Sequence, residues 1–322
     1  MAESIRLIAA EGVLESPART RAPQRQALRV AAVQERWHPD PQEHEQALGA
    51  AIHLAAEQGA SLICLQELTL SPYFAVEPAG PGRGGAEPEP LPGGPTHVFA
   101  ARMAAETGAN VHASLYERAE QPDGLGYNTA IVVAPDGALL ARTRKLHIPV
   151  TAGYHEDRYF RPGPAGAEAF TLLKVGEAQV GLPTCWDQWF PELARAYSLR
   201  GADVLVYPTA IGSEPDHPGF DTEPLWERVI VGNAIANGTF MIAVNRIGEE
   251  PPLRFYGSSF ICDPYGRILV QAPRDEPAVL VADLDLDQRR DWLELFPFLG
   301  TRRPDAYASL AAPAGDSQAG AS

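Results

Sequence analysis

The chain alternates between short apolar runs that suit buried strands and longer stretches whose apolar residues recur at helical spacing. We expect strands over residues 28–33, 61–65, 110–116, 127–134, 138–143, 178–182, 204–207, 239–245 and 257–263. We expect helices over residues 41–58, 96–107, 192–200 and 225–237. This alternation of helices with buried apolar strands predicts an α/β fold built in layers. No glycine-rich phosphate loop follows the first strand, which argues against a nucleotide-binding site there.

Length and composition suit one large globular unit. The chain has 322 residues, of which 45% are hydrophobic, so it can bury one extended core. Residues 1–27 are rich in Ala, Arg, Glu and Pro, and we expect them to form a loosely ordered extension. We expect a single domain over residues 28–310 and a flexible tail over residues 311–322, which are small and polar.

Charge and cysteine content exclude several classes of function. The net charge of −15 disfavours nucleic acid as a partner, because phosphate binding needs a clustered basic face. No apolar run approaches the length of a membrane span, and the N-terminus lacks the pattern of a signal peptide. The three cysteines cannot all pair and are not spaced as metal ligands. We therefore expect a cytoplasmic protein without a metal site.

Cys185 follows an apolar strand-like run and is itself followed by a helix-like run that starts at Pro191. A nucleophile on such a tight strand-to-helix turn projects out of the sheet, and the backbone N–H groups after it face developing negative charge. An arbitrary cysteine is more often a buried core residue. The polar and aromatic residues 186–189 do not continue a core strand, so we interpret Cys185 as catalytic.

Charged residues stand at the ends of two other predicted strands. Glu67 follows the apolar run 62–65, and Lys145 follows the return strand of a predicted hairpin. A buried carboxylate is costly unless it is paired or serves as a base. Taken singly, Glu67 and Lys145 are weak signals, since most such residues only solvate a surface.

Together these residues resemble the catalytic set of the nitrilase superfamily of carbon–nitrogen hydrolases. Glu67 matches the general base of that family, Lys145 the lysine of its -RKxHIP- segment, and Cys185 the nucleophile of its -CWDxxFPE- elbow. Glu156 matches a second family glutamate that helps to position the substrate and the lysine. The similarity runs over about residues 28 to 307, with the motifs in the usual order.

The resemblance implies a four-layer αββα sandwich, a covalent thiol mechanism without cofactors, and a homodimer or larger homo-oligomer. Within the superfamily, residues 185–192, 207–215, 245–248, 255–260 and 302–305 resemble the N-carbamoylputrescine amidases. We therefore expect hydrolysis of a carbamoyl amine to amine, carbon dioxide and ammonia. Two stretches depart from this pattern, Pro183–Thr184 and the Gly/Pro-rich residues 78–95, which lie where a substrate-side loop is expected.

The residues around the elbow give some indication of the substrate. Gln188 and Trp189 occupy positions where related hydrolases of carbamoyl amino acids carry arginines, so an obvious carboxylate clamp is missing. An acidic side chain would meet a cationic amine tail, and an aromatic one would line its aliphatic part or offer a cation–π face. Each candidate has ordinary packing or a local hydrogen bond as its alternative. The candidate substrate-binding residues are Tyr73, Trp186, Asp187 and Glu214.

Three alternatives remain open at this stage. A β-ureidopropionase, an ω-amidase or an aliphatic nitrilase would use the same three catalytic residues. A papain-like hydrolase would use His147 or His155 as base, but it needs a further histidine oriented by asparagine, and His217 has no convincing context for that role. A scaffold protein on the same fold would have no reason to keep a buried acid, lysine and thiol together.

Overall fold

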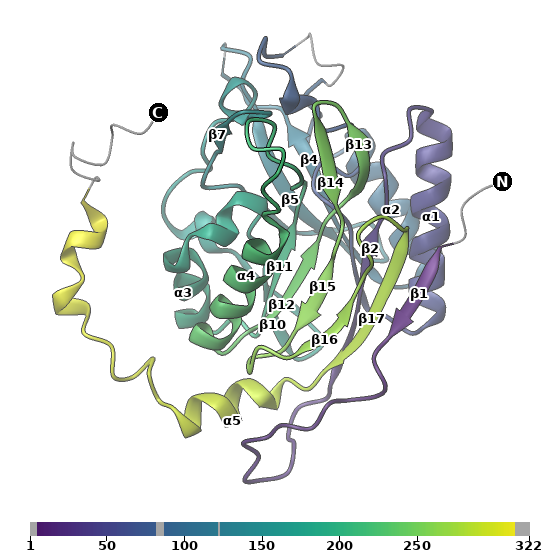
Figure 1. The fold of residues 1–322 in the computed structure, drawn as a ribbon. Helices are drawn as coiled ribbons and strands as arrows, with labels where there is room; N and C mark the ends of the chain where they lie inside the picture. Colours follow the sequence, from purple (N-terminus) through teal and green to yellow (C-terminus); the bar gives the residue numbers. More distant parts are fainter. Residues whose placement is uncertain (1–4, 82–86, 122, 313–322) are drawn as a thin grey trace.

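Two β-sheets stack face to face and carry helices on their outer faces (Figure 1). The computed structural model describes residues 5–81, 87–121 and 123–312. The first sheet has the order β1 (Arg6–Ala9), β17 (Ala278–Leu284), β2 (Leu28–Gln34), β3 (Leu62–Cys64), β4 (Asn110–Glu117), β5 (Tyr127–Val133) and β6 (Leu139–Arg144). The second has the order β16 (Ile268–Gln271), β15 (Phe260–Cys262), β12 (Phe240–Val244), β11 (Val204–Pro208), β10 (Ala178–Gly181) and β9 (Leu172–Val175). Two hairpins are formed by β7 (Val150–Thr151) with β8 (Tyr154–His155), and by β13 (Ile247–Glu250) with β14 (Leu253–Tyr256).

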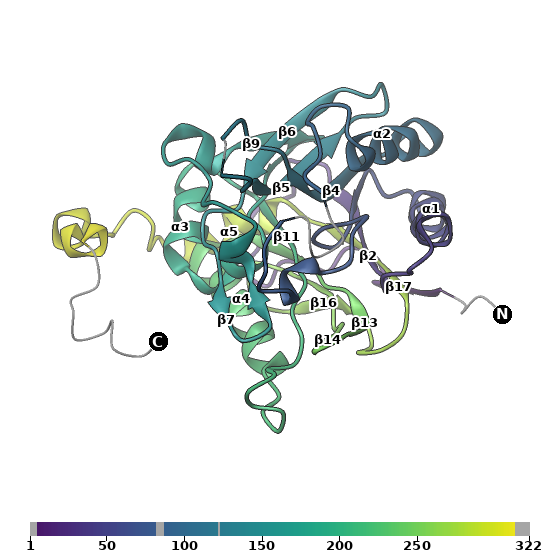
Figure 2. The ribbon, with the colours of Figure 1, turned by 90° about the horizontal axis from the view of Figure 1, so that it is seen from above.

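Apolar side chains fill the space between the layers. Val30 of β2 and Val206 of β11 belong to the core between the two sheets. The other face of the first sheet packs against α1 (Pro41–Glu57) and α2 (Pro95–Thr107), and that of the second against α3 (Pro191–Leu199) and α4 (Glu223–Asn237). Figure 2 shows these helix pairs on opposite sides of the sheets. The predicted four-layer αββα sandwich is confirmed.

The local sequence explains why these elements form. Successive residues of a strand point to opposite faces, so Val30 enters the core between the sheets while Ala31 packs under the helices. Both faces are buried, which is why the strands are apolar without alternation. Helix α1 begins after Asp40, whose Oδ1 accepts hydrogen bonds from the backbone N–H groups of Gln42 at 2.8 Å and Glu43 at 3.1 Å.

All the predicted strands and helices overlap elements of the structure, although several other elements were not predicted. The unpredicted strands are β1, β7, β8, β9, β13, β14, β16 and β17, and the unpredicted α-helix is α5 (Asp287–Leu295). β17 pairs with β2 along seven residues of each strand and with β1 on its other side. Its sequence is an apolar, β-branched run, so the signal for a strand was present.

Residues 5–27 differ from the expected loosely ordered extension. β1 pairs in parallel with β17, and Ser16 is buried. Arg19 forms ion pairs with Asp285 and Asp291, and the Nη1 atom of Arg25 lies 2.9 Å from Oδ1 of Asp203. The arginines that made this stretch seem solvated instead meet carboxylates of the main body, and these contacts attach the stretch to the sandwich.

The C-terminal stretch runs away from the sandwich after α5, on the side where α3 lies (Figures 1 and 2). Two short 3-10 turns, over Pro304–Ala306 and Ala308–Ala311, bury none of their residues. Most of the expected flexible tail, residues 313–322, lies outside the described residues, as do residues 82–86 of the Gly/Pro-rich stretch. Within the described part of the chain, no helix has the length and apolar character needed to cross a membrane.

Candidate active site

The candidate catalytic residues emerge at the same edge of the sandwich because of how the strands are paired. β3 is parallel to β4, β4 is antiparallel to β5, and β5 is antiparallel to β6, so β3 and β6 run in the same direction. Glu67 therefore follows β3 and Lys145 follows β6 at one edge of the first sheet. Cys185 follows β10 in the second sheet, which is parallel to its neighbour β11.

Cys185 lies on a sharp turn between β10 and α3. It starts a 3-10 turn over Cys185–Trp189 and has a φ of 41°, in the left-handed region that side chains other than glycine rarely adopt. Only 5% of the residue is exposed. Strained backbone of this kind clusters at active sites, where surrounding contacts hold a side chain in one orientation. The geometry is that of a strand-to-helix nucleophile turn.

Asp187 stabilises this turn and does not line the catalytic cavity, contrary to the substrate-binding role considered from the sequence. Its Oδ2 atom accepts a hydrogen bond from the Thr184 N–H at 3.1 Å. Its Oδ1 atom lies 3.0 Å from the backbone nitrogen and 2.7 Å from Nδ1 of His147, whose ring stacks on Phe190. Both carboxylate oxygens are therefore occupied by neighbours in the protein.

The Lys145 ammonium lies between two buried carboxylates. Its Nζ atom donates to Oε1 of Glu67 at 3.0 Å and to Oε1 and Oε2 of Glu156 at 2.9 and 2.7 Å. The side chains of all three residues have no exposed surface. A cation shared in this way compensates charges that burial would otherwise make very costly.

Two further side chains fix the carboxylates, and their contacts were not predicted from the sequence. Asn128 Nδ2 donates to Oε1 of Glu67 at 2.7 Å. The Tyr73 hydroxyl donates to Oε1 of Glu156 at 2.8 Å, which places this tyrosine behind Glu156 and not among the residues that line the cavity. Asn128 is the second residue of the predicted strand 127–134, and an amide near the start of an otherwise mostly apolar strand was the only available signal.

Burial and the neighbouring charges shift the pKa values of these groups. Burial alone would lower the pKa of Lys145, but Glu156 and Glu67 outweigh that effect and raise it above the ordinary value. Burial raises the pKa of Glu156 to about 7, opposed by Lys145 and reinforced by Glu67. Burial and the nearby Glu67 raise the pKa of the Cys185 thiol, and Lys145 opposes them. The cysteine therefore rests as a thiol and needs a base to become a nucleophile.

A cavity of about 300 Å³ opens above Cys185. It is lined by Pro149, Thr151, Tyr154, Glu156, Cys185, Trp186, Trp189, Ala210, Ile211, Glu214, Thr222 and Leu225. Trp186 and Glu214, two of the candidate substrate-binding residues, are among them. No histidine lines this cavity in the described chain, and the described part of residues 78–95 contributes nothing to it.

Glu214 introduces a carboxylate into this largely apolar cavity. Its Oε1 atom accepts a hydrogen bond from the Thr222 hydroxyl at 3.2 Å, and Oε2 has no hydrogen-bond partner among the described residues. Neither lysine nor arginine lines the cavity in the part of the chain that the structure describes. The cavity thus combines apolar walls with the reactive thiol and two glutamates, Glu156 of the lysine cluster and Glu214.

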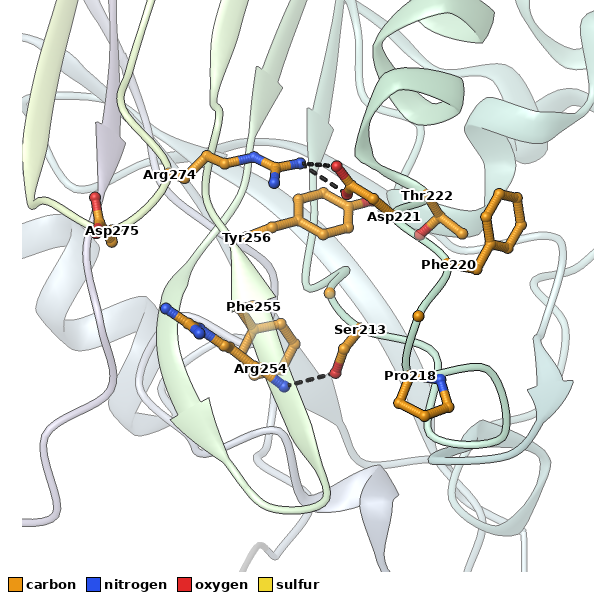
Figure 3. A pocket seen from close by; sticks show the side chains of 12 residues that line it. Ser213, Pro218, Phe220, Asp221, Thr222, Arg254, Phe255, Tyr256, Arg274 and Asp275 are labelled. Carbon is orange, nitrogen blue, oxygen red and sulfur yellow. Dashed lines mark hydrogen bonds and ion pairs between the residues drawn. The ribbon is translucent and has the colours of Figure 1, made fainter.

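A second cavity, of about 410 Å³, is lined by residues of the loop over 212–222 and by Arg254, Phe255, Tyr256, Arg274 and Asp275 (Figure 3). Arg274 points to Asp221 there, with Nη2 at 2.8 Å from Oδ1, and the Ser213 hydroxyl accepts a hydrogen bond from the Arg254 N–H at 3.0 Å. This cavity contains none of Glu67, Lys145 and Cys185. Nowhere in the described residues do three His, Cys, Asp or Glu side chains gather in a way that could hold a metal ion.

The sandwich, the thiol turn and the buried lysine with its two carboxylates together define a class of hydrolase, and comparison with known proteins identifies the same class. The chain belongs to the carbon-nitrogen hydrolase family, whose model matches residues 29–294. It is an enzyme that hydrolyses carbon–nitrogen bonds.

Individual relatives cover most of the chain. It is 40% identical over 267 residues to an N-carbamoylputrescine amidase of Solanum lycopersicum, covering 80% of this chain and 86% of that protein. It is 36% identical over 291 residues to a citrullinase of Francisella tularensis, covering 88% of this chain and 98% of the relative. A carbon-nitrogen hydrolase from Helicobacter pylori G27 superposes with a TM-score of 0.76 at 30% identity, covering 89% of this chain and 99% of that structure. The predicted resemblance to N-carbamoylputrescine amidases is confirmed.

Proposed function

We propose that the protein is a thiol amidohydrolase that cleaves a carbamoyl amine similar to N-carbamoylputrescine. The observation that carries the proposal is the position of Lys145 between Glu67 and Glu156, beside a cavity that exposes Cys185 at a strained turn. A thiol, a base and a fixed cation are the three groups that attack on an amide carbonyl requires.

In the first half-reaction, Glu67 takes the thiol proton and the Cys185 sulfur attacks the carbonyl carbon of the terminal ureido group. Lys145 and a backbone N–H near Trp186 stabilise the oxyanion of the tetrahedral intermediate. A preorganised donor of this kind lowers the barrier by about 3–4 kcal/mol. Glu67 then gives its proton to the departing nitrogen, ammonia leaves, and the carbonyl carbon stays bonded to sulfur as a thioester-type intermediate.

In the second half-reaction, water attacks that carbonyl carbon while Glu67 accepts a proton from the water. The carbon–sulfur bond breaks, Cys185 recovers its proton, and a carbamate is released. The carbamate decomposes to carbon dioxide and the free amine. Glu156 holds Lys145 in place throughout, because both of its oxygens accept hydrogen bonds from the ammonium.

The lining of the cavity supports a cationic substrate tail. Glu214 is the acidic group that faces the cavity away from the catalytic cluster, and its Oε2 atom is available to an ammonium group. A charge-assisted hydrogen bond of this kind contributes about 1.5–3 kcal/mol, or roughly ten- to a hundred-fold in affinity. Trp186 and Trp189 provide the apolar wall beside the thiol, where the methylene groups of the tail would pack.

A ureido amino acid such as citrulline is a second candidate, because a citrullinase covers 88% of this chain. Its ammonium would meet Glu214, but its carboxylate would find no lysine or arginine among the described residues that line the cavity. The lack of a lysine or arginine to bind a carboxylate also counts against N-carbamoyl-β-alanine and dicarboxylic monoamides, the substrates of a β-ureidopropionase and an ω-amidase.

Ammonia release from a panel of substrates tests the proposal. The panel contains N-carbamoylputrescine, citrulline, N-carbamoyl-β-alanine, a dicarboxylic monoamide and an aliphatic nitrile. We expect the highest kcat/KM for N-carbamoylputrescine, and carbon dioxide and putrescine in equal amounts with ammonia. A higher kcat/KM for any of the acids would keep the hydrolase class and reject the carbamoyl amine.

We also propose that the protein forms a homo-oligomer through the face beside α5. An apolar groove there is lined by Ile235, Ala236, Trp292, Phe296, Pro297, Phe298 and Thr301. Phe296 is 53% exposed. The C-terminal arm, residues 297–312, carries Leu310, which is 63% exposed. Because the arm points away from its own sandwich, a second copy is the partner that both the groove and the arm would contact (Figure 2).

Analytical ultracentrifugation of the Phe296→Asp variant tests this interface. We expect the wild type to sediment as a dimer or larger species and the variant to dissociate at concentrations where the wild type is assembled. Phe220→Asp is the matched control, because Phe220 is 55% exposed and lines the cavity of Figure 3 but not the groove beside α5. A monomeric wild type would refute the interface.

A further inference from the structure

Arg246 is a fully buried arginine that connects the two sheets next to the active site. It follows β12 in the second sheet, and its guanidinium reaches the loop that follows β3 in the first sheet. The Nη2 atom donates to the backbone carbonyl of Glu67 at 2.6 Å, of Leu68 at 3.2 Å and of Ser71 at 3.3 Å. One cation thereby fixes the main chain that carries the general base, including Leu68, whose φ is 50°.

Glu250 extends this contact to the other catalytic carboxylate. Its Oε1 atom lies 2.7 Å from Nη1 of Arg246, and its Oε2 atom accepts a hydrogen bond from the Tyr73 N–H at 2.5 Å. The hydroxyl of the same tyrosine donates to Glu156. The contacts close a ring that runs through Glu67, Lys145, Glu156, Tyr73, Glu250 and Arg246 and returns to the carbonyl of Glu67.

We propose that Arg246 and Glu250 are a positioning pair for the reaction. Arg246 holds the main chain of Glu67, and Glu250 holds Tyr73, which in turn holds Glu156, so both glutamates stay in position around Lys145. Neither residue lines the catalytic cavity, and both are occupied by backbone groups of residues 67–73, so they act on the reaction through those residues. A charge buried as deeply as that of Arg246 is costly unless it is paired, and Glu250 is the carboxylate that pairs with it. Small displacements of a base from its reacting atom reduce rates steeply, which makes this pair a determinant of kcat.

Glu250→Gln tests the pair with little change in shape. A neutral amide has one acceptor oxygen, so it can serve Arg246 or the Tyr73 N–H but not both. We expect kcat on the best amide substrate of the panel to fall about 10- to 100-fold while KM changes less than about threefold. The rate at which iodoacetamide alkylates Cys185 should fall as well, and this readout does not depend on which substrate is correct.

The control is a similar ion pair elsewhere in the chain. Arg267 and Asp263 are also four residues apart, with Nε and Oδ2 separated by 2.6 Å, and Asp263 likewise accepts hydrogen bonds from backbone N–H groups. Asp263→Asn should lower the melting temperature in the same way as Glu250→Gln and leave kcat within about twofold of wild type. An equal loss of kcat in both variants would show a general effect of stability and overturn the proposal.

A double-mutant cycle separates positioning from a purely structural role. If Glu250 acts through Tyr73, then Glu250→Gln should reduce kcat much less in a Tyr73→Phe background than in the wild type. Additive effects of the two substitutions would contradict the proposal. Arg246→Lys keeps the charge but loses the fork that reaches several carbonyls, so it should also lower kcat. Wild-type kcat in the folded form of either single variant, Glu250→Gln or Arg246→Lys, would overturn the proposal.

Discussion

Lys145 and Glu156 form a buried ion pair in which both carboxylate oxygens contact the ammonium, at 2.9 and 2.7 Å from Nζ. The second contact of Lys145, to Glu67, uses a single oxygen at 3.0 Å. Glu67 thus keeps its Oε2 atom without a hydrogen-bond partner among the described residues, whereas both oxygens of Glu156 contact the ammonium. This difference in contacts distinguishes the two glutamates, although both are fully buried.

Replacing Lys145 with methionine should reduce turnover by about two to three orders of magnitude, because the oxyanion loses a fixed donor. It should also destabilise the fold by about 3–5 kcal/mol near pH 8, since two buried carboxylates lose their cation. Near about pH 6 the loss should be smaller, because one carboxylate takes up a proton. Urea unfolding at the two pH values measures this. Lys174→Met is the control, since the chain has only these two lysines and Lys174 is exposed.

The fall of kcat/KM on the acidic side of the pH profile should reflect protonation of Glu156. With the pKa of this buried carboxyl raised from 4.5 to about 7, it takes up a proton as the pH falls through about 7 and no longer pairs with Lys145. We expect kcat/KM to fall below that pH. The Glu156→Gln variant should have a lower kcat/KM and lack this fall. An unchanged fall in the variant would assign the titration to another group.

The raised pKa of Glu156 also determines how the free energy of unfolding changes with pH. The folded state holds the Glu156 proton more tightly than the unfolded state, so the contribution of this residue to stability falls as pH rises from 4.5 to about 7. Glu156→Gln should flatten the dependence of unfolding free energy on pH in that window. A pH dependence equal to that of the wild type would contradict the assignment.

Much of the fold and part of the site could be predicted from the sequence. Strands such as β2 were predicted because both of their faces are buried, which leaves a continuous apolar run. Cys185 was identified from the polar and aromatic residues that interrupt its strand. The roles of Lys145 and Glu156, by contrast, came from the family resemblance and not from local pattern.

Other parts of the site depend on contacts that no local pattern encodes. Asp187 is only two residues from the nucleophile in the sequence, yet the 3-10 turn directs its carboxylate back to Thr184 and His147. Arg246 lies 179 residues from Glu67 in the sequence, and only the pairing of the sheets brings its guanidinium to that loop. Interactions of this range are determined by the topology, which is why sequence reasoning did not find them.

The three cysteines should differ sharply in reactivity. Cys185 lines the cavity, whereas Cys64 and Cys262 lie in apolar cores with no exposed surface, and burial raises the pKa of both thiols. Iodoacetamide should inactivate the enzyme with a single modification, which peptide mass spectrometry should locate at Cys185. Inactivation that follows modification of either core cysteine would refute the assignment.

Glu214→Gln should change substrate preference more than catalysis. Losing the charge should raise KM for N-carbamoylputrescine by roughly ten- to a hundred-fold, with a smaller effect on kcat, and should leave N-carbamoyl-β-alanine almost unaffected. Asp216→Asn is the control, because Asp216 is on the same loop, is exposed and does not line the cavity. An equal change in KM for both substrates would rule out a specific contact with the ammonium.

The central claim is that Cys185 is the nucleophile, and ammonia release by purified Cys185→Ala tests it most directly. The side chain is small and the neighbouring ion pairs are untouched, so we expect the variant to fold with a melting temperature close to that of the wild type. Turnover on the best substrate of the panel should be near zero. Turnover by folded Cys185→Ala at more than about one per cent of the wild-type rate would contradict a mechanism in which the thiolate forms the covalent intermediate.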